Sequence, residues 1–278
     1  MIPASFEYVR PASLDEALGL LGGEGAKVIA GGQSLLPLMK LRLARPERLV
    51  DIGRLEGLRG TRRLADGRLA IGALTRYADL MADPAVGAYA ALSDALPSIG
   101  DVQVRNRGTV GGALAHCDPA SDLPAVLLAV DAEVVARSRR GERTIALADF
   151  FEGPFQTALA ADEVLTEVRL PALSPGRASA YVNLEQAASG FAIAGAAVAL
   201  GKGAADARVG VTGVGHVPYR ATAVEQALAR GADAASAAAH AAEGQTVNSD
   251  IHADAAYRSA IAAVVVRRAI EAAQARLG

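Results

Sequence analysis

Apolar positions in the first 57 residues switch between the period of a strand and the period of a helix. Three short apolar or alternating runs predict strands, at residues 6–10, 27–30 and 48–52. Ser13, followed three residues later by Glu16, predicts a capping box that opens a helix, and the glycine pair Gly22-Gly23 ends it. Strands that alternate with helices over so short a span predict a small parallel βαβ unit.

From residue 58 onward, short strands and helices follow one another in mixed order. Asp66-Gly67 between two apolar runs predicts a hairpin with a type I′ turn, and Thr75 is the predicted N-cap of a helix that continues to Met81. Further helices are predicted at residues 85–96 and 123–129, and further strands at residues 132–136, 144–147 and 164–170. This mixture predicts an α+β layer with a mixed sheet, packed on the first unit.

The segment from Pro171 to Gly176 is the predicted linker, because it contains two prolines, a serine and a glycine. Beyond it, strands are predicted at residues 180–184, 191–200 and 208–214, and helices at residues 222–229, 232–243 and 255–276. Three strands followed by three helices predict a separate α+β domain. We therefore expect an α+β protein with three parts, at residues 1–57, 58–175 and 176–278.

Composition narrows the class of protein. A chain of 278 residues that is 51% hydrophobic can bury an ample core, and a net charge of −2 without a basic run argues against nucleic acid as a main partner. The single cysteine, Cys117, rules out a disulfide within the chain and favours a reducing compartment. Without a leader pattern or an apolar run of about 20 residues, the chain is expected to be soluble and cytoplasmic, with no direct membrane insertion.

Two glycine pairs beside hydroxyl residues are the candidate chemistry, at Ala30-Gly31-Gly32-Gln33-Ser34 and at Thr109-Val110-Gly111-Gly112. Glycine lets backbone N–H groups approach a ligand closely, and a nest of such groups suits phosphate oxygens. The first loop lies between a predicted strand and a predicted helix with Ser34 as N-cap, which is the arrangement of an anion site. The alternative for either loop is a tight turn without a ligand. The sequence contains neither G-x-G-x-x-G nor G-x-x-x-x-G-K-[ST], which argues against a Rossmann dehydrogenase and a P-loop NTPase.

Five segments together carry a family resemblance. They are AGGQSLLPLMK (30–40), IGALTRYADL (71–80), IGDVQVRNRGTVGGALAHCDPASDLPA (99–125), ASGFAIAGAAVAL (188–200) and GVGHVPYRATAVEQAL (213–228). In this order and spacing, over nearly the whole chain, they resemble the FAD-binding medium subunits of the molybdenum hydroxylases, the carbon monoxide dehydrogenase and xanthine dehydrogenase family. The resemblance implies a two-loop FAD-binding fold, followed by a C-terminal flavoprotein domain of three antiparallel strands and helices.

The resemblance also implies which residues hold the FAD. They are Ala30, Gly31, Gly32, Gln33, Ser34, Leu35, Thr109, Val110, Gly111, Gly112, Ala113, Ser121, Asp122, Leu165 and Phe191. In this interpretation the N–H groups of Gly31, Gly32 and Gln33 bind one phosphate, and those of Gly111 and Gly112 bind the other. No residue of the chain is predicted to act as a catalytic group.

Side chains of this set have assigned roles and simpler alternatives. Thr109 and Ser34 donate hydroxyl hydrogen bonds to phosphate, or else make ordinary turn and cap bonds. Asp122, with Ser121 beside it, accepts hydrogen bonds from ribityl or ribose hydroxyls, or else caps the helix that follows. Phe191 covers one face of the isoalloxazine, or else is a core aromatic residue at the start of a buried strand.

Some positions depart from the family pattern or carry no predicted chemistry. The family often has Asn where this chain has Ala113, and Lys where it has Asn183, so one side-chain contact and one cation are expected to be missing. The four histidines are scattered, without a second ligand at metal-binding spacing, so no metal site is predicted. Cys117 alone cannot hold an iron–sulfur cluster, and a small, partly buried residue is its default role.

The resemblance implies an FAD-carrying electron-transfer subunit of a three-subunit enzyme. A small subunit with [2Fe–2S] clusters would supply electrons, a large molybdopterin subunit would oxidise the substrate, and quinone, dioxygen or NAD would receive the electrons. The complex is expected to be a dimer of heterotrimers. A stand-alone FAD-dependent oxidase and a non-catalytic nucleotide-binding scaffold remain as alternatives. The substrate itself is not set by this chain.

Overall fold

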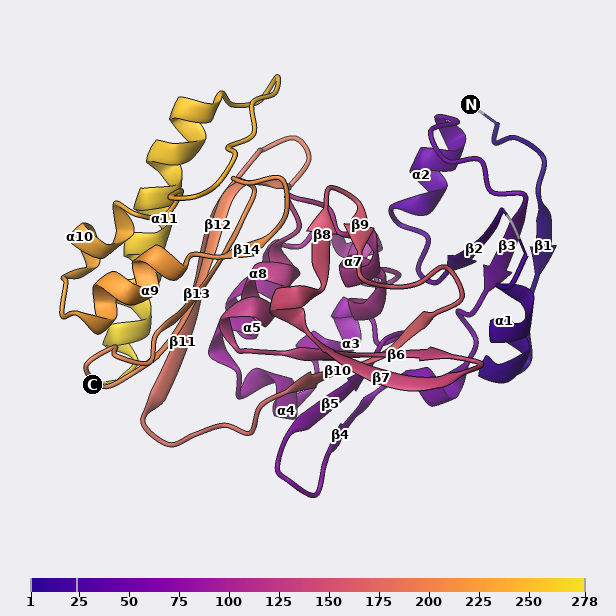
Figure 1. Cartoon of the computed structure of the whole chain (residues 1–278), viewed down its shortest axis with the longest axis horizontal. Helices are drawn as coiled ribbons and strands as arrows, with labels where there is room; N and C mark the ends of the chain where they lie inside the picture. The colour runs from indigo at the N-terminus through magenta and orange to yellow at the C-terminus, as the bar shows by residue number, and fades with distance from the viewer. Residues whose placement is uncertain (1, 24, 278) are drawn as a thin grey trace.

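The computed structural model describes residues 2–23 and 25–277, arranged as three neighbouring parts along the chain (Figure 1). The first part is a parallel sheet, as predicted, and its strand order is β1-β3-β2. Its strands are β1 (Glu7–Val9), β2 (Ala26–Ile29) and β3 (Arg48–Asp51), and its helices are α1 (Leu14–Leu20) and α2 (Leu35–Lys40). The turn that follows β2 therefore lies at the carboxyl edge of this sheet, where open parallel sheets bind ligands.

The start of α1 shows how closely the local sequence prediction was met. The hydroxyl of Ser13 accepts a hydrogen bond from the N–H of Glu16 at 3.1 Å, which is the first half of the predicted capping box. The carboxylate of Glu16 reaches one residue further back, and accepts from the N–H of Ala12 at 2.7 Å. The first bond satisfies an N–H group that the helix start would leave free, and the second holds the chain just before the N-cap.

The second part contains a five-stranded sheet of order β4-β5-β10-β6-β7, in which each pairing is antiparallel, so the sheet is not the mixed one that was predicted. Its strands are β4 (Thr61–Arg63), β5 (Leu69–Gly72), β6 (Glu133–Ser138), β7 (Gly141–Ala146) and β10 (Val164–Leu170), and a small hairpin pairs β8 (Phe151–Gly153) with β9 (Gln156–Thr157). Its helices are α3 (Tyr77–Met81), α4 (Pro84–Gly87), α5 (Ala90–Ala95), α6 (Val102–Arg105), α7 (Val110–His116) and α8 (Asp122–Ala129), with 3-10 turns at Glu56–Leu58, Leu96–Ser98 and Leu147–Asp149.

Three local predictions for this part were wrong. Gly67 has a left-handed φ of 85° and Asp66 does not, so the hairpin turn is not type I′. The hydroxyl of Thr75 binds Gly60 and Gly72 instead of capping α3. The predicted helix at 85–96 divides into α4 and α5 at Tyr89, which is buried and donates its hydroxyl to the carbonyl of Pro171 at 2.6 Å.

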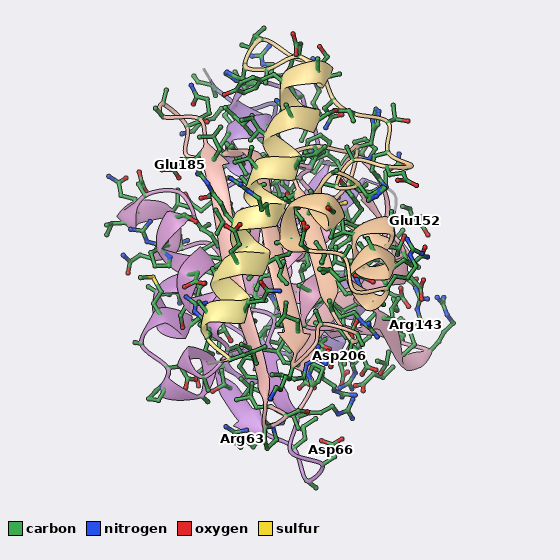
Figure 2. The ribbon with its side chains drawn as sticks, turned by 90° about the vertical axis from the view of Figure 1, so that its left-hand side faces the viewer. Arg63, Asp66, Arg143, Glu152, Glu185 and Asp206 are labelled. Atoms are coloured by element: carbon green, nitrogen blue, oxygen red, sulfur yellow. The ribbon has the colours of Figure 1, made fainter. Side chains whose placement is uncertain are left out.

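The third part is a sheet of order β11-β12-β13-β14 between two layers of helices (Figures 1 and 2). Its strands are β11 (Arg177–Glu185), β12 (Ala192–Gly201), β13 (Arg208–Thr212) and β14 (Tyr219–Arg220), and its helices are α9 (Thr222–Ala229), α10 (Ala234–Ala238) and α11 (Ala255–Ala275). The fourth strand was not predicted. Helix α11 covers one face, while α8 and α5 from the second part cover the other.

Small residues in β12 and β13 let both helical layers come close to this sheet. Along β12, Ala194 and Ala196 face the core shared with α11, while Ala197 faces the core of the second part. A Cβ on Gly210 would overlap the carbonyl oxygen of Ala125, so glycine there allows the backbone of α8 to lie on the sheet. The alanine-rich sequence is thus explained by close packing.

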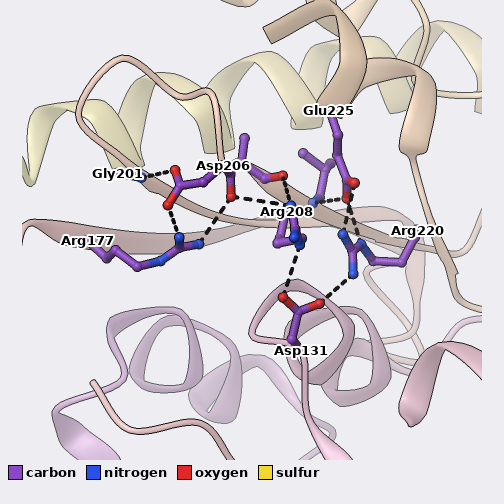
Figure 3. Close-up of polar contacts among 9 residues, drawn as sticks. Asp131, Arg177, Gly201, Asp206, Arg208, Arg220 and Glu225 are labelled. Atoms are coloured by element: carbon purple, nitrogen blue, oxygen red, sulfur yellow. Dashed lines mark hydrogen bonds and ion pairs between the residues drawn. The ribbon is translucent and has the colours of Figure 1, made fainter. Parts of the chain in front are cut away.

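An ion-pair network joins the second and third parts (Figure 3). Asp131, just after α8, accepts from Nε of Arg208 at 3.0 Å and from Nη1 of Arg220 at 2.6 Å. Arg220 also pairs with Glu225 at 2.6 Å. The apolar cores cross the predicted boundaries too, since Val164 packs with the first part and Tyr181 packs with the second. Because the cores are shared in this way, packing does not mark where one part ends, and the boundaries after residues 57 and 175 stay predictions.

Candidate functional site

The two glycine loops, far apart in the sequence, touch in the structure. Gly31 lies directly against the backbone of Arg107 and Gly108, the two residues that precede Thr109. A Cβ on Gly31 would overlap the carbonyl oxygen of Arg107 and stand 2.8 Å from its carbonyl carbon. Glycine is therefore required at residue 31 for the loops to meet at the carboxyl edge of the parallel sheet.

The first loop presents free backbone donors. Within residues 2–23 and 25–277, the N–H groups of Gly31, Gly32, Gln33 and Ser34 donate to no other group. Gly32 has a left-handed φ of 76°, which turns the chain into α2, and the N–H of Leu36 begins the helical bonding to the carbonyl of Gly32 at 3.0 Å. Successive unbonded N–H groups at a helix start fit an anionic ligand such as a phosphate.

Ser34 does not cap α2 as predicted. Its backbone is already helical, with φ of −100° and ψ of −46°, and its hydroxyl makes no cap bond. An N-cap residue usually has extended dihedral angles that aim its oxygen back at the helix N–H groups, and Ser34 lacks that geometry. Its hydroxyl is therefore exposed beside the free N–H groups.

The second loop is built differently, and its predicted donors are already engaged. The N–H of Gly111 donates to the carbonyl of Ala73 at 2.8 Å, and the N–H of Gly112 donates to the hydroxyl of Thr109 at 3.1 Å. Thr109 is thus the N-cap of α7, the simpler of its two predicted roles. A Cβ on Gly111 would stand 2.5 Å from that of Ala73, so this glycine is required by packing inside the protein.

Asp122, the first residue of α8, is a buried carboxylate with no cation beside it in the described part of the chain. Its Oδ1 accepts from the hydroxyl of Tyr181 and from Nδ2 of Asn183, the latter at 3.0 Å. Burial, with only 4% of the residue exposed, raises the pKa of Asp122 to about 6, and the two hydrogen bonds oppose that rise. Asp122 does not cap α8, because Ser121 occupies the N-cap position.

The other carboxylate oxygen of Asp122, Oδ2, has no donor among the described residues, so it can accept from a ligand hydroxyl. Sequence reasoning missed that Tyr181 and Asn183 hold this carboxylate. The spacing of Tyr181 and Asn183 could have indicated this pairing, because residues two apart on a strand point to the same face of the sheet. Asn183, where the family often has Lys, supplies an amide donor in place of a cation.

The remaining predicted residues lie in different environments. Phe191 is 51% exposed just before β12, so the alternative of a core aromatic residue was wrong. Leu165 is buried in β10 opposite Ala136. Leu35 is the first residue of α2, Ala30 begins the first loop, and Val110 and Ala113 belong to the first turn of α7.

Burial shifts the pKa values of the two neighbouring titratable residues at the end of α7, His116 and Cys117. Burial raises the pKa of the Cys117 thiol to about 11, and its Sγ lies 3.3 Å from the carbonyl oxygen of Gly153. The ring of His116 packs on Phe155 with centroids 5.1 Å apart, and burial lowers its pKa. Among the described residues, no group of three His, Cys, Asp or Glu side chains is placed to hold a metal ion, and no helix is long and apolar enough to cross a membrane.

Touching glycine loops in an α+β fold define the class of two-loop flavin-binding proteins, and comparisons with known proteins agree. Residues 4–173 match the FAD binding domain in molybdopterin dehydrogenase, and residues 179–273 match the CO dehydrogenase flavoprotein C-terminal domain. The chain is 41% identical to the carbon monoxide dehydrogenase medium chain of Hydrogenophaga pseudoflava, over 99% of both chains. It is 40% identical to the 6-hydroxypseudooxynicotine dehydrogenase complex subunit alpha of Paenarthrobacter nicotinovorans, over 97% of this chain and 95% of that one.

Solved structures agree as well. The chain superposes on carbon monoxide dehydrogenase from Hydrogenophaga pseudoflava with a TM-score of 0.95 and 42% identity, over 99% of both chains. The protein belongs to the family of FAD-binding medium subunits of molybdenum hydroxylases, of the carbon monoxide dehydrogenase type.

Proposed function

We propose that this chain carries FAD as an electron relay, between [2Fe–2S] clusters of a small partner subunit and an external acceptor. The observation that supports the proposal most is the row of unbonded N–H groups from Gly31 to Ser34, beside the second loop. Bound FAD supplies the redox chemistry, and the chain's own residues bind and orient it.

The proposed site runs from the loops to the third part of the chain. The N–H groups of Gly31 and Gly32 would bind pyrophosphate oxygens, and the second loop would contribute close backbone approach more than free donors. Oδ2 of Asp122 would accept from a ribityl hydroxyl, and the half-exposed Phe191 would shield the ring. The rest of the fifteen residues named above complete the proposed site.

The proposed partners follow from the family and from what the chain lacks. A relay without substrate acid–base chemistry needs a donor, so we propose a small [2Fe–2S] subunit and a large molybdopterin subunit, assembled as a cytoplasmic dimer of heterotrimers. The relatives named above carry the names of enzymes for carbon monoxide and for 6-hydroxypseudooxynicotine. Such different substrates at about 40% identity support a chain that does not choose the substrate.

Co-expression with the neighbouring subunits tests this proposal. We expect one co-eluting complex whose flavin absorbance bleaches when the substrate of the molybdenum subunit is added without oxygen. The isolated chain, saturated with FAD, should show no bleaching of its flavin absorbance with that substrate. Turnover by the isolated chain at the rate of the complex would instead establish a stand-alone oxidase. A complex that contains no flavin would favour the alternative of a non-catalytic scaffold.

A further inference from the structure

The segments that form the two loops contain no charged side chain. Residues 29–36 and 108–115 supply only backbone groups, hydroxyls, an amide and apolar side chains. A pyrophosphate carries negative charge, and ion pairs to guanidinium groups are stronger than neutral hydrogen bonds. A cation for this charge must therefore come from residues that flank the loops.

Two arginines flank the place where the loops meet. The carbonyl of Arg107 touches Gly31 of the first loop, and Arg107 is two residues before Thr109 of the second. Arg76 pairs with Thr109 in an isolated antiparallel bridge. Residues paired in this way carry their side chains on the same face, so Arg76 lies beside the Thr109 hydroxyl that caps α7.

Both guanidinium groups are available. Among the described residues, neither Arg76 nor Arg107 forms a side-chain hydrogen bond or an ion pair, and Arg107 is exposed. Two other arginines are engaged: Arg105 donates to the carbonyl of Gly100 at 2.8 Å, and Arg59 donates to the carbonyl of Gly53. An arginine without a carboxylate partner beside an anion-binding loop fits bidentate recognition of phosphate.

We propose that Arg76 and Arg107 form the cationic part of the cofactor site, and neutralise the pyrophosphate that the glycine loops hold. The inference rests on the proposed FAD function and adds the charge that the loops lack. The N–H groups of Gly111 and Gly112 in the second loop already bond inside the protein. In this proposal the two guanidinium groups replace them as donors to the pyrophosphate.

The test compares double variants in the assembled complex. We expect R76Q/R107Q to lower FAD affinity at least tenfold, and to weaken the loss of affinity with rising salt, since fewer ion pairs remain to be screened. R76K/R107K, which keeps the charge without the bidentate fork, should regain part of the affinity. The control R139Q/R230Q removes two exposed arginines elsewhere, in the β6–β7 turn and after α9, and should retain FAD as the unmodified complex does.

Riboflavin, which shares the ring and ribityl chain but has no phosphate, separates this proposal from a general loss of folding. Its affinity, measured by fluorescence quenching or by competition with FAD, should be the same in R76Q/R107Q and in the unmodified complex. Unchanged FAD affinity and salt dependence in R76Q/R107Q, or an equal loss of FAD and riboflavin affinity, would overturn the proposal. Absence of FAD from the unmodified complex would instead overturn the proposed function itself.

Discussion

At the scale of single residues, the ionised carboxylate of Asp122 is unfavourable for folding, whereas the proposed FAD site uses it as a hydrogen-bond acceptor. A buried carboxylate with two neutral donors and no cation is costly to ionise, and this cost appears as the raised pKa. Tyr77 and Tyr181 face it, and Glu185 adds negative charge that raises its pKa further. The raised pKa means that ionisation of Asp122 opposes folding at neutral pH, and in the proposed site the same carboxylate accepts a ligand hydroxyl through Oδ2.

Asp122→Asn should therefore stabilise the fold while weakening FAD binding. The unfolded carboxyl ionises near pH 3.8 and the folded one near pH 6, so the unmodified protein loses stability as pH rises through this window. We expect the variant to match the unmodified protein near pH 3.5 and to exceed it above pH 7 by on the order of 2–3 kcal/mol. Urea unfolding of both proteins at several pH values measures this difference. A constant difference across the range would show that ionisation of Asp122 is not its source.

At the scale of elements, the contact between the two loops depends on the absence of a side chain at residue 31. The loop after β2 and the segment before α7 come within backbone contact there. Glycine also provides the left-handed turn at residue 32, but that requirement is local. Glycine at residue 31 is required by a segment about 75 residues away in the sequence.

Gly31→Ala should force the loops apart, because its Cβ would overlap the carbonyl oxygen of Arg107. We expect the complex to lose its FAD, while the circular dichroism spectrum stays that of the unmodified protein. Gly19→Ala is the matched control: its Cβ would meet no atom within 4 Å in α1, and alanine favours a helix interior by about 0.5–1 kcal/mol. Full flavin occupancy in Gly31→Ala would show that the loop contact is not needed for binding.

At the scale of the whole molecule, the sheet of the third part contacts the second part at both of its ends. Figure 2 shows Glu185 and Asp206 at opposite ends of this sheet. Asp122 is bonded to Tyr181 and Asn183 near the Glu185 end, while Asp131 and its arginines lie near Asp206 (Figure 3). The two ends therefore join the second and third parts through different groups, a buried carboxylate at one end and partly exposed ion pairs at the other.

Asp131→Asn should weaken this docking without affecting the cofactor. Asparagine tolerates the left-handed φ of 53° at this position, but it cannot form the ion pairs with Arg208 and Arg220. We expect a loss of unfolding free energy on the order of 1 kcal/mol, because the pairs are partly exposed, and the loss should shrink in high salt. Flavin content after gel filtration should match that of the unmodified complex. A parallel loss of flavin would mean that the two ends of the sheet are coupled.

Features that depend on short stretches of chain could be predicted from the amino-acid sequence. Apolar periodicity placed the strands that became β10 and β12, Ser13 and Glu16 marked the start of α1, and the ordered glycine segments indicated the family and its cofactor. These signals work because dihedral preference, capping and side-chain period are properties of neighbouring residues.

The hydrogen-bond partners of the polar groups could not be predicted in this way, because they depend on how the chain packs. Thr75 binds Gly60 rather than capping α3, Gly111 donates to Ala73 rather than to a ligand, and Asp122 is held by residues about 60 positions away. Each outcome depends on which segments meet when the sheets and helices pack, and buried polar groups then bond to whatever is within reach. The sequence therefore identified the loops, and the packing determined which of their N–H groups were left for a ligand.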